Sequence, residues 1–205
     1  MRTLAIETAT EACSVALFDG DTLLDARHEV LGRGHAERLI PLIAELPDKG
    51  KAERILVSLG PGSFTGTRIG IAAARALGLA WGVQVLGYPT LALVAAGARR
   101  TSGAAEVLVA MTGGHGEWFV QPFGTEGQTL AEHRSLSPEQ ATSLATENVA
   151  GSQAEALVER RGSGTAHRML PDARWALDLP PSCLSARIAP IYGRPPDARP
   201  AGDPR

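Results

Sequence analysis

The fold is decided by residues 3–30, which read TLAIETATEACSVALFDGDTLLDARHEV. Three apolar or alternating stretches, 3–8, 12–18 and 22–30, have the length of strands and are separated by short polar turns. Asp19-Gly20 stands between two of them and is typical of a tight hairpin turn. The segment therefore predicts three consecutive strands.

Helices and strands are expected to alternate after this segment. Apolar residues at helical spacing predict a helix over 36–46. We expect a buried strand at 55–59, a glycine-rich loop at 60–66, a helix of small residues at 67–82, a strand at 83–87 and a helix near 90–99. The first half thus has the order β-β-β-α-β-α, plus an extra strand and helix.

The second half repeats this order. Strands fit 106–111, 117–123 and 128–134, a capping box at 137–140 opens a helix to about 145, and a strand at 148–150 and a helix at 154–161 follow. The repeat places Glu7 over Thr112. We predict an α/β fold with two like domains, 1–102 and a smaller 103–194, and a proline-rich tail at 195–205.

Composition excludes several classes of protein. The chain of 205 residues is 44% hydrophobic and 20% charged with a net charge of −2, which favours a folded chain without overall attraction to nucleic acid or lipid. Cys13 and Cys183 form no cluster and no two histidines stand three or four residues apart, so we expect no metal site. Because no apolar run fits a signal peptide or a membrane helix, we expect a cytoplasmic protein.

The loop GPGSFTGTR, residues 60–68, could direct backbone N–H groups at an anion, since it follows a strand and precedes a helix. It lacks the lysine of a phosphate-binding P-loop and the spacing of a dinucleotide loop. Glu7 ends the first strand, where a carboxylate could hold a metal–phosphate complex, but its counterpart Thr112 carries no charge. An ATPase or phosphotransferase using Glu7 and Gly60–Gly66 is the alternative function, and the candidate weak anion or nucleotide site is Glu7, Gly62, Ser63 and Thr65.

Small residues recur at every fourth position of the second helix: Gly66, Gly70, Ala74, Gly78 and Gly82. Each interior glycine costs a helix about 0.8–1.0 kcal/mol relative to alanine, so the ridge indicates that something packs very closely against it. The chain's own sheet and a helix of a partner protein both fit. The spacing does not decide between them.

Residues 3–18, His35 with LIPLI at 39–43, and GPGSFTGTRIGI at 60–71 together resemble the TsaB (YeaZ) family. PTL at 89–91 also fits, and PIYGR at 190–194 fits more loosely. The resemblance implies an actin-like fold of duplicated domains. The chain differs at Glu7, where the family usually has Asp, and at Thr112-Gly113-Gly114, where it usually has Asp-Ala-Arg.

The resemblance also implies a function. The chain would be a non-catalytic scaffold or activator subunit that pairs with TsaD, which carries the metal and transfers the threonylcarbamoyl group to tRNA. TsaE would belong to the same assembly, and tRNA would touch this chain only indirectly. No cofactor is expected beyond weak binding of ATP or ADP.

We assign the partner surface to the two helices of the first half. It comprises Leu39, Leu42, Ile43, Gly66, Gly70, Ile71, Ala74, Arg75 and Gly78. A self-complementary surface of this kind favours twofold pairing, so we expect a homodimer for the isolated chain and a heterodimer with TsaD.

Overall fold

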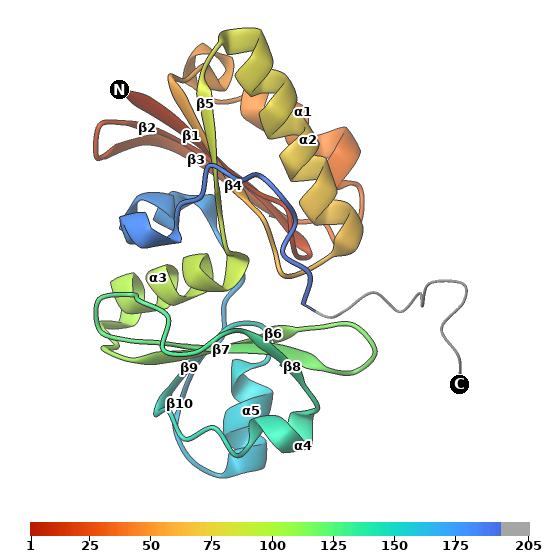
Figure 1. Ribbon diagram of the computed structural model, residues 1–205, viewed down its shortest axis with the longest axis vertical. Coiled ribbons are helices and arrows are strands. Elements are labelled where there is room, and N and C mark those ends of the chain that lie inside the picture. The colour runs from red at the N-terminus through yellow and green to blue at the C-terminus, as the bar shows by residue number, and fades with distance from the viewer. Residues whose placement is uncertain (194–205) are drawn as a thin grey trace.

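Two five-stranded sheets of the same strand order frame the molecule, as the computed structural model shows for residues 1–193 (Figure 1). The proline-rich tail at 195–205 lies outside the described residues.

The first half contains five strands and three α-helices: β1 (Arg2–Glu7), β2 (Ala12–Asp19), β3 (Thr22–Val30), α1 (His35–Ala44), β4 (Arg54–Ser58), α2 (Phe64–Trp81), β5 (Gln84–Tyr88) and α3 (Thr90–Ser102). Its sheet has the order β3-β2-β1-β4-β5. β1 is antiparallel to β2 and parallel to β4.

The second half contains β6 (Val107–Thr112), β7 (Trp118–Phe123), β8 (Arg134–Leu136), α4 (Pro138–Ala141), β9 (Asn148–Ala150), α5 (Ala154–Arg161) and β10 (Thr165–His167). Its sheet has the order β10-β9-β6-β7-β8, which matches the first sheet when read from the other edge. The 3-10 helices η1 (Pro47–Gly50), η2 (Ala173–Asp178) and η3 (Pro181–Cys183) complete the described chain. The predicted duplication of β-β-β-α-β-α is confirmed.

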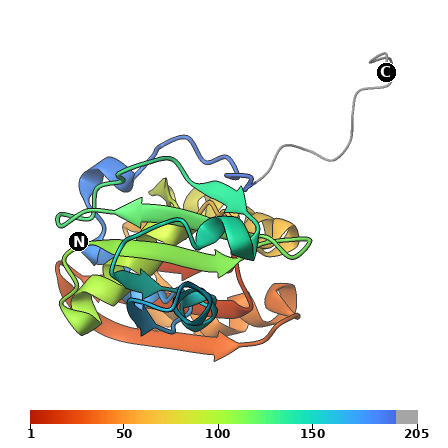
Figure 2. The same ribbon diagram turned by 90° about the horizontal axis from the view of Figure 1, so that it is seen from below.

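Three hydrophobic clusters fill the space between the sheets and the helices that pack on them. α1 and α2 cover the outer face of the first sheet, and α4 and α5 cover the outer face of the second (Figure 1 and Figure 2). α3 lies between the two sheets with η2 beside it, and its residues 91–98 are buried from both sides. A helix buried all round explains why this segment lacks a polar face.

Residues after β10 return to the first half. Ser14 of β2 donates to Asp172 at 3.3 Å and accepts from the backbone N–H of Ala173 at 2.9 Å. Ser185 forms an isolated bridge with Gly87 of β5. The division of the chain into domains 1–102 and 103–194 stays a prediction.

Local structure corrects three expectations in the second half. The strand expected at 128–134 is wrong: β8 begins at Arg134, and the segment before it makes only an isolated bridge between Phe123 and Thr129. The helix expected to reach 145 ends at Ala141, after which the hydroxyls of Thr142 and Ser143 bond back to helix carbonyls and compete with its backbone ladder. β10, only three residues long, was not expected, since so short a strand has no readable period.

Among residues 1–193, no helix combines the length and the apolar character needed to cross a bilayer.

Candidate functional site between the two sheets

A cleft of about 930 Å³ opens between the two halves. Most of its lining comes from the β1–β2 turn at 9–11, the loop and start of α2 at 62–64 and 67–68, the β6–β7 hairpin at 111–115 and the segment 190–193, and Gly32 and Phe119 complete it. Four segments far apart in the sequence therefore meet at one place.

An aromatic pair and an arginine lie in the cleft lining. Phe64 of α2 stacks on Tyr192 with ring centroids 6.0 Å apart. The guanidinium of Arg68 lies 3.5 Å from the centre of the Phe64 ring and donates to the Tyr192 hydroxyl at 2.9 Å. These contacts attach the segment after Pro190 to the start of α2.

The glycines of the loop before α2 permit close approach to the β1–β2 turn. A Cβ on Gly62 would lie 2.0 Å from the carbonyl oxygen of Ala9, and one on Gly66 would lie 2.1 Å from that of Thr8. The Thr8 hydroxyl donates to the carbonyl of Gly66 at 2.8 Å. The glycine-rich pattern is therefore explained by packing of the loop against its own turn.

The backbone donors of this loop are partly occupied. Ser63 N–H donates to the Ala9 carbonyl at 2.6 Å, and the Ser63 hydroxyl accepts from Gly66 N–H at 3.1 Å as the N-cap of α2. Of the residues assigned to the candidate anion site, Gly62 and Ser63 line the cleft, whereas Thr65 is exposed outside the lining. The loop thus uses for its own structure two N–H groups that an anion would need.

Glu7 lies behind the cleft wall, not in it. It is fully buried, its Oε1 accepts from Ala9 N–H at 2.6 Å, and its Oε2 has no hydrogen-bond partner. Burial raises the pKa of Glu7 from 4.5 to about 7, although the neighbouring hydroxyls of Ser58 and Thr90 favour its charged form. This geometry corrects the expectation that Glu7 and the loop share one site, because the carboxyl group has no access to the cleft.

Thr112, which ends β6 as Glu7 ends β1, does line the cleft. Its hydroxyl accepts from the side-chain amide of Gln153 at 2.8 Å and lies 3.0 Å from the Ser152 hydroxyl. These are neutral groups bonded to one another. Across residues 1–193, no three histidine, cysteine or acidic side chains gather as a metal site would require.

From Gly66 to Gly78 the small-residue ridge of α2 faces the chain's own sheet and turn, whereas Gly82 is the C-cap of the helix and faces open space. A Cβ on Gly70 would lie 2.4 Å from the Thr8 hydroxyl oxygen, and one on Gly78 would lie 2.4 Å from a methyl group of Val85 in β5. Ala74, between them, is fully buried in the cluster that joins α2 to the sheet. The expectation that this ridge faces a partner is corrected, since the first sheet already covers it.

Most of the other residues assigned to the partner surface are also buried between the helices and the first sheet. Leu39, Leu42, Ile43 and Ile71 are buried in the same cluster. Arg75 is exposed, but its guanidinium donates to the carbonyl of Ile188 at 2.6 Å. The partner contact itself stays a prediction.

Sequence reasoning did not identify Phe64, Arg68 and Tyr192 as a group. Tyr192 belongs to the stretch PIYGR, which resembles the family only loosely. The pairing of residues 124 positions apart has no local signal.

Comparisons with known proteins agree with this architecture. Residues 28–186 match the family model described as TsaD: tRNA N6-adenosine threonylcarbamoyltransferase. The chain is 43% identical over 124 residues to the tRNA threonylcarbamoyladenosine biosynthesis protein TsaB of Escherichia coli, a match covering 58% of this chain and 53% of that protein. The TsaB protein of Haemophilus influenzae is 39% identical over 98 residues, covering 45% of this chain and 40% of that protein. The chain thus spans about half the length, or less, of these curated relatives.

A solved structure extends the similarity over the whole fold. YeaZ from Pseudomonas aeruginosa superposes with a TM-score of 0.81 at 29% identity, covering 93% of this chain and 99% of that one. The two mixed sheets and their helices confirm the actin-like class expected from the sequence.

Proposed function

Because the chain belongs to the TsaB (YeaZ) family, we propose that it is a subunit of the machinery that makes threonylcarbamoyladenosine in tRNA. In this proposal it carries out no chemistry itself and binds a TsaD protein as a scaffold or activator. TsaE joins the same assembly, and tRNA contacts this chain only indirectly.

The observation that carries the proposal is the outer face of α1 and α2. The helices pack side by side over the first sheet (Figure 1), and their sides away from it leave apolar groups exposed. Leu79 is 87% exposed and Ile40 is 50% exposed. Beyond the first turn of α2, where the exposed Phe64 belongs to the cleft, the exposed small and apolar residues of the two helices are Ala36, Ile40, Pro41, Ala44, Ala72, Ala76, Leu79 and Ala80.

Such a face fits a helical partner. Small residues let a second pair of helices approach closely, and the larger Ile40 and Leu79 supply apolar area that water exposure makes costly. We propose that TsaD covers this face, and that a second copy of the chain covers it when TsaD is absent. We therefore assign the partner surface to the outer face of α1 and α2 in place of the buried ridge, which faces the first sheet.

The alternative of an ATPase or phosphotransferase receives no support from the cleft. Glu7 is buried behind the wall, and Thr112 offers only a hydroxyl. Calorimetry with ATP and Mg²⁺ tests this alternative: micromolar binding that Glu7→Ala abolishes would establish it in place of the scaffold.

Two arginine substitutions on α2 test the partner surface. Ala76→Arg adds a long charged side chain on the exposed side, so the variant should remain folded by circular dichroism and lose co-purification with TsaD of the same source. Ala74→Arg, two positions away, would bury the same charge in the core and should unfold the protein.

The matched control is Glu159→Arg on the exposed side of α5 in the second half, which should leave TsaD binding unchanged. If Ala76→Arg is folded and still binds TsaD as the control does, the outer face of α1 and α2 is not the partner surface.

A further inference from the structure

β3 is an exposed edge of the first sheet. It is nine residues long and pairs only with β2 in the part of the chain that the structure describes. At the opposite edge, β5 is covered because Gly87 and Ser185 exchange two backbone hydrogen bonds, of 2.8 and 2.9 Å. β3 has no such cover, and it exposes Leu23, Leu24 and Val30, the last by 64%. A long edge of this kind is a template for another strand.

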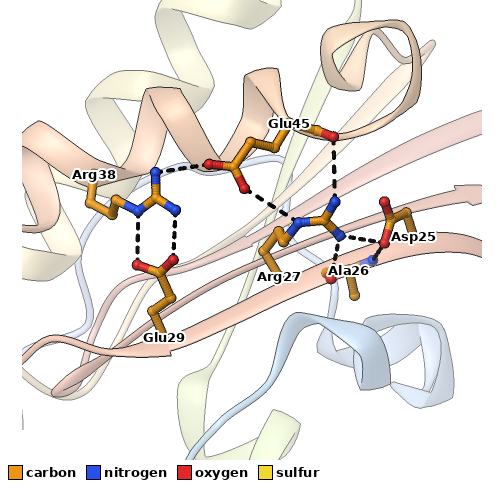
Figure 3. Close-up of polar contacts among 6 residues, drawn as sticks. All are labelled: Asp25, Ala26, Arg27, Glu29, Arg38 and Glu45. Atoms are coloured by element: carbon orange, nitrogen blue, oxygen red, sulfur yellow. Dashed lines mark hydrogen bonds and ion pairs between the residues drawn. The ribbon is translucent and has the colours of Figure 1, made fainter.

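The backbone of β3 is capped at its centre by its own side chains. Ala26 N–H donates to Oδ1 of Asp25 at 2.8 Å, and the Ala26 carbonyl accepts from the guanidinium of Arg27 at 2.9 Å (Figure 3). Asp25 and Arg27 also form an ion pair with one another at 2.5 Å. In an antiparallel sheet alternate residues direct both backbone groups away from the neighbouring strand, so these two caps occupy the free edge. We name Asp25, Ala26 and Arg27 the edge clip.

The edge clip is anchored to α1 through a chain of charges. Glu45, which follows α1, lies 3.4 Å from Arg27 and 2.9 Å from Arg38. Arg38 in turn donates to both carboxylate oxygens of Glu29, at 2.6 and 2.8 Å (Figure 3). Arg27 is therefore held in the orientation that caps Ala26.

The sequence of β3 is complementary to itself in charge. In an antiparallel pair of copies centred on Ala26, Asp25 of each copy lies opposite Arg27 of the other, within the part of β3 that pairs regularly with β2. Cross-strand pairs of opposite charge stabilise a sheet, and like charges in the same place destabilise it. The two Ala26 residues could then exchange the N–H···O=C bonds that the caps now satisfy.

We propose that β3 is a strand-pairing surface for a second copy of this chain, kept closed in the free protein by the edge clip. The apolar side chains at both ends of β3 provide the area that pairing would bury, and the centre of the strand provides the register. The edge clip satisfies the Ala26 N–H and carbonyl within one chain. Two copies that pair would therefore gain no additional hydrogen bonds at Ala26.

Exchanging the charges at positions 25 and 27 removes the two caps on Ala26 but keeps opposite charges facing one another between copies. In the Asp25→Lys/Arg27→Glu variant, an ammonium cannot accept from Ala26 N–H and a carboxylate cannot donate to its carbonyl. The opposite charges still face one another between copies. We expect sedimentation velocity to show self-association at least about tenfold tighter than in the wild type.

The matched control is Asp25→Lys alone, which removes one cap but places like charges opposite one another. It should associate no more than the wild type. Adding Ala26→Pro to the reversed variant removes the edge donor and should abolish the new association. All variants are measured with and without Ala76→Arg, so that contact through the outer face of α1 and α2 is told apart from pairing through β3.

Disulfide trapping reports the register. Ala26→Cys in the reversed variant should form a disulfide between copies under oxidation, whereas Thr22→Cys should not, because the two copies of that position lie far apart in this register. If the reversed variant does not fold, Asp25→Thr/Arg27→Thr replaces it in the same measurements, with two strand-favouring residues. The proposal is overturned if the folded reversed variant, or the double-threonine variant in its place, associates no more than the wild type. It is also overturned if Asp25→Lys alone associates as tightly as the reversed variant.

Discussion

The buried carboxyl group of Glu7 makes a measurable prediction for stability against pH. Its folded pKa of about 7 lies above the ordinary 4.5, so folding takes up a proton between these values and stability falls as pH rises through them. The difference, at 1.36 kcal/mol for each pKa unit, corresponds to a cost of about 3 kcal/mol at pH 8. Below about pH 4 the group is protonated in both states and the cost disappears.

Glu7→Gln should remove this cost, because the amide has nearly the same shape and no charge. Its carbonyl can accept from Ala9 N–H as Oε1 does now. We expect the variant to be about 3 kcal/mol more stable than the wild type at pH 8, a rise in Tm of about 6–12 °C for a chain of this size, and within about 1 kcal/mol of it at pH 5.

Urea unfolding of both proteins at several pH values between 5 and 8 measures the effect. Subtracting one curve of unfolding free energy against pH from the other cancels the contribution of the histidines, which are present in both proteins. The surface variant Glu155→Gln, which loses only an exposed ion pair with Arg168, should differ from the wild type by less than about 1 kcal/mol at every pH. If the difference in free energy of unfolding between the wild type and Glu7→Gln stays constant from pH 5 to pH 8, ionisation of the buried Glu7 does not destabilise the folded protein and the reasoning is refuted.

Two further substitutions test the packing of α2. Gly70→Ala should lower the free energy of unfolding by about 1–3 kcal/mol, because its methyl group would meet the Thr8 hydroxyl; urea unfolding that shows no loss would mean that the ridge has room. Ser63→Ala should lower it by about 1 kcal/mol through loss of the N-cap, and equal stability of Ser63→Ala and wild type would show that water replaces the cap without cost.

Element order was readable because it depends on local patterns. Residues within a few positions of one another predict the hairpin at Asp19-Gly20 and the capping box at Ser137. Such local patterns also give the order of elements within each half, and the duplication appears when the two orders are compared. The expected strand at 128–134 was wrong and β10 was not expected, because in such short segments the pairing partner decides and the local period does not.

By itself, the sequence determined that α2 carries a ridge of small residues and that something must lie close to it. Only the tertiary structure decided that this neighbour is the chain's own turn at Thr8 and strand at Val85. Periodicity states which side chains share a face of a helix, but it contains no information about what lies opposite that face. In the same way, a glutamate at the end of a strand can point into a cleft or into the core. Ser58 at the end of β4 and Thr90 at the start of α3 lie beside Glu7, and this tertiary packing places its carboxyl group in the core.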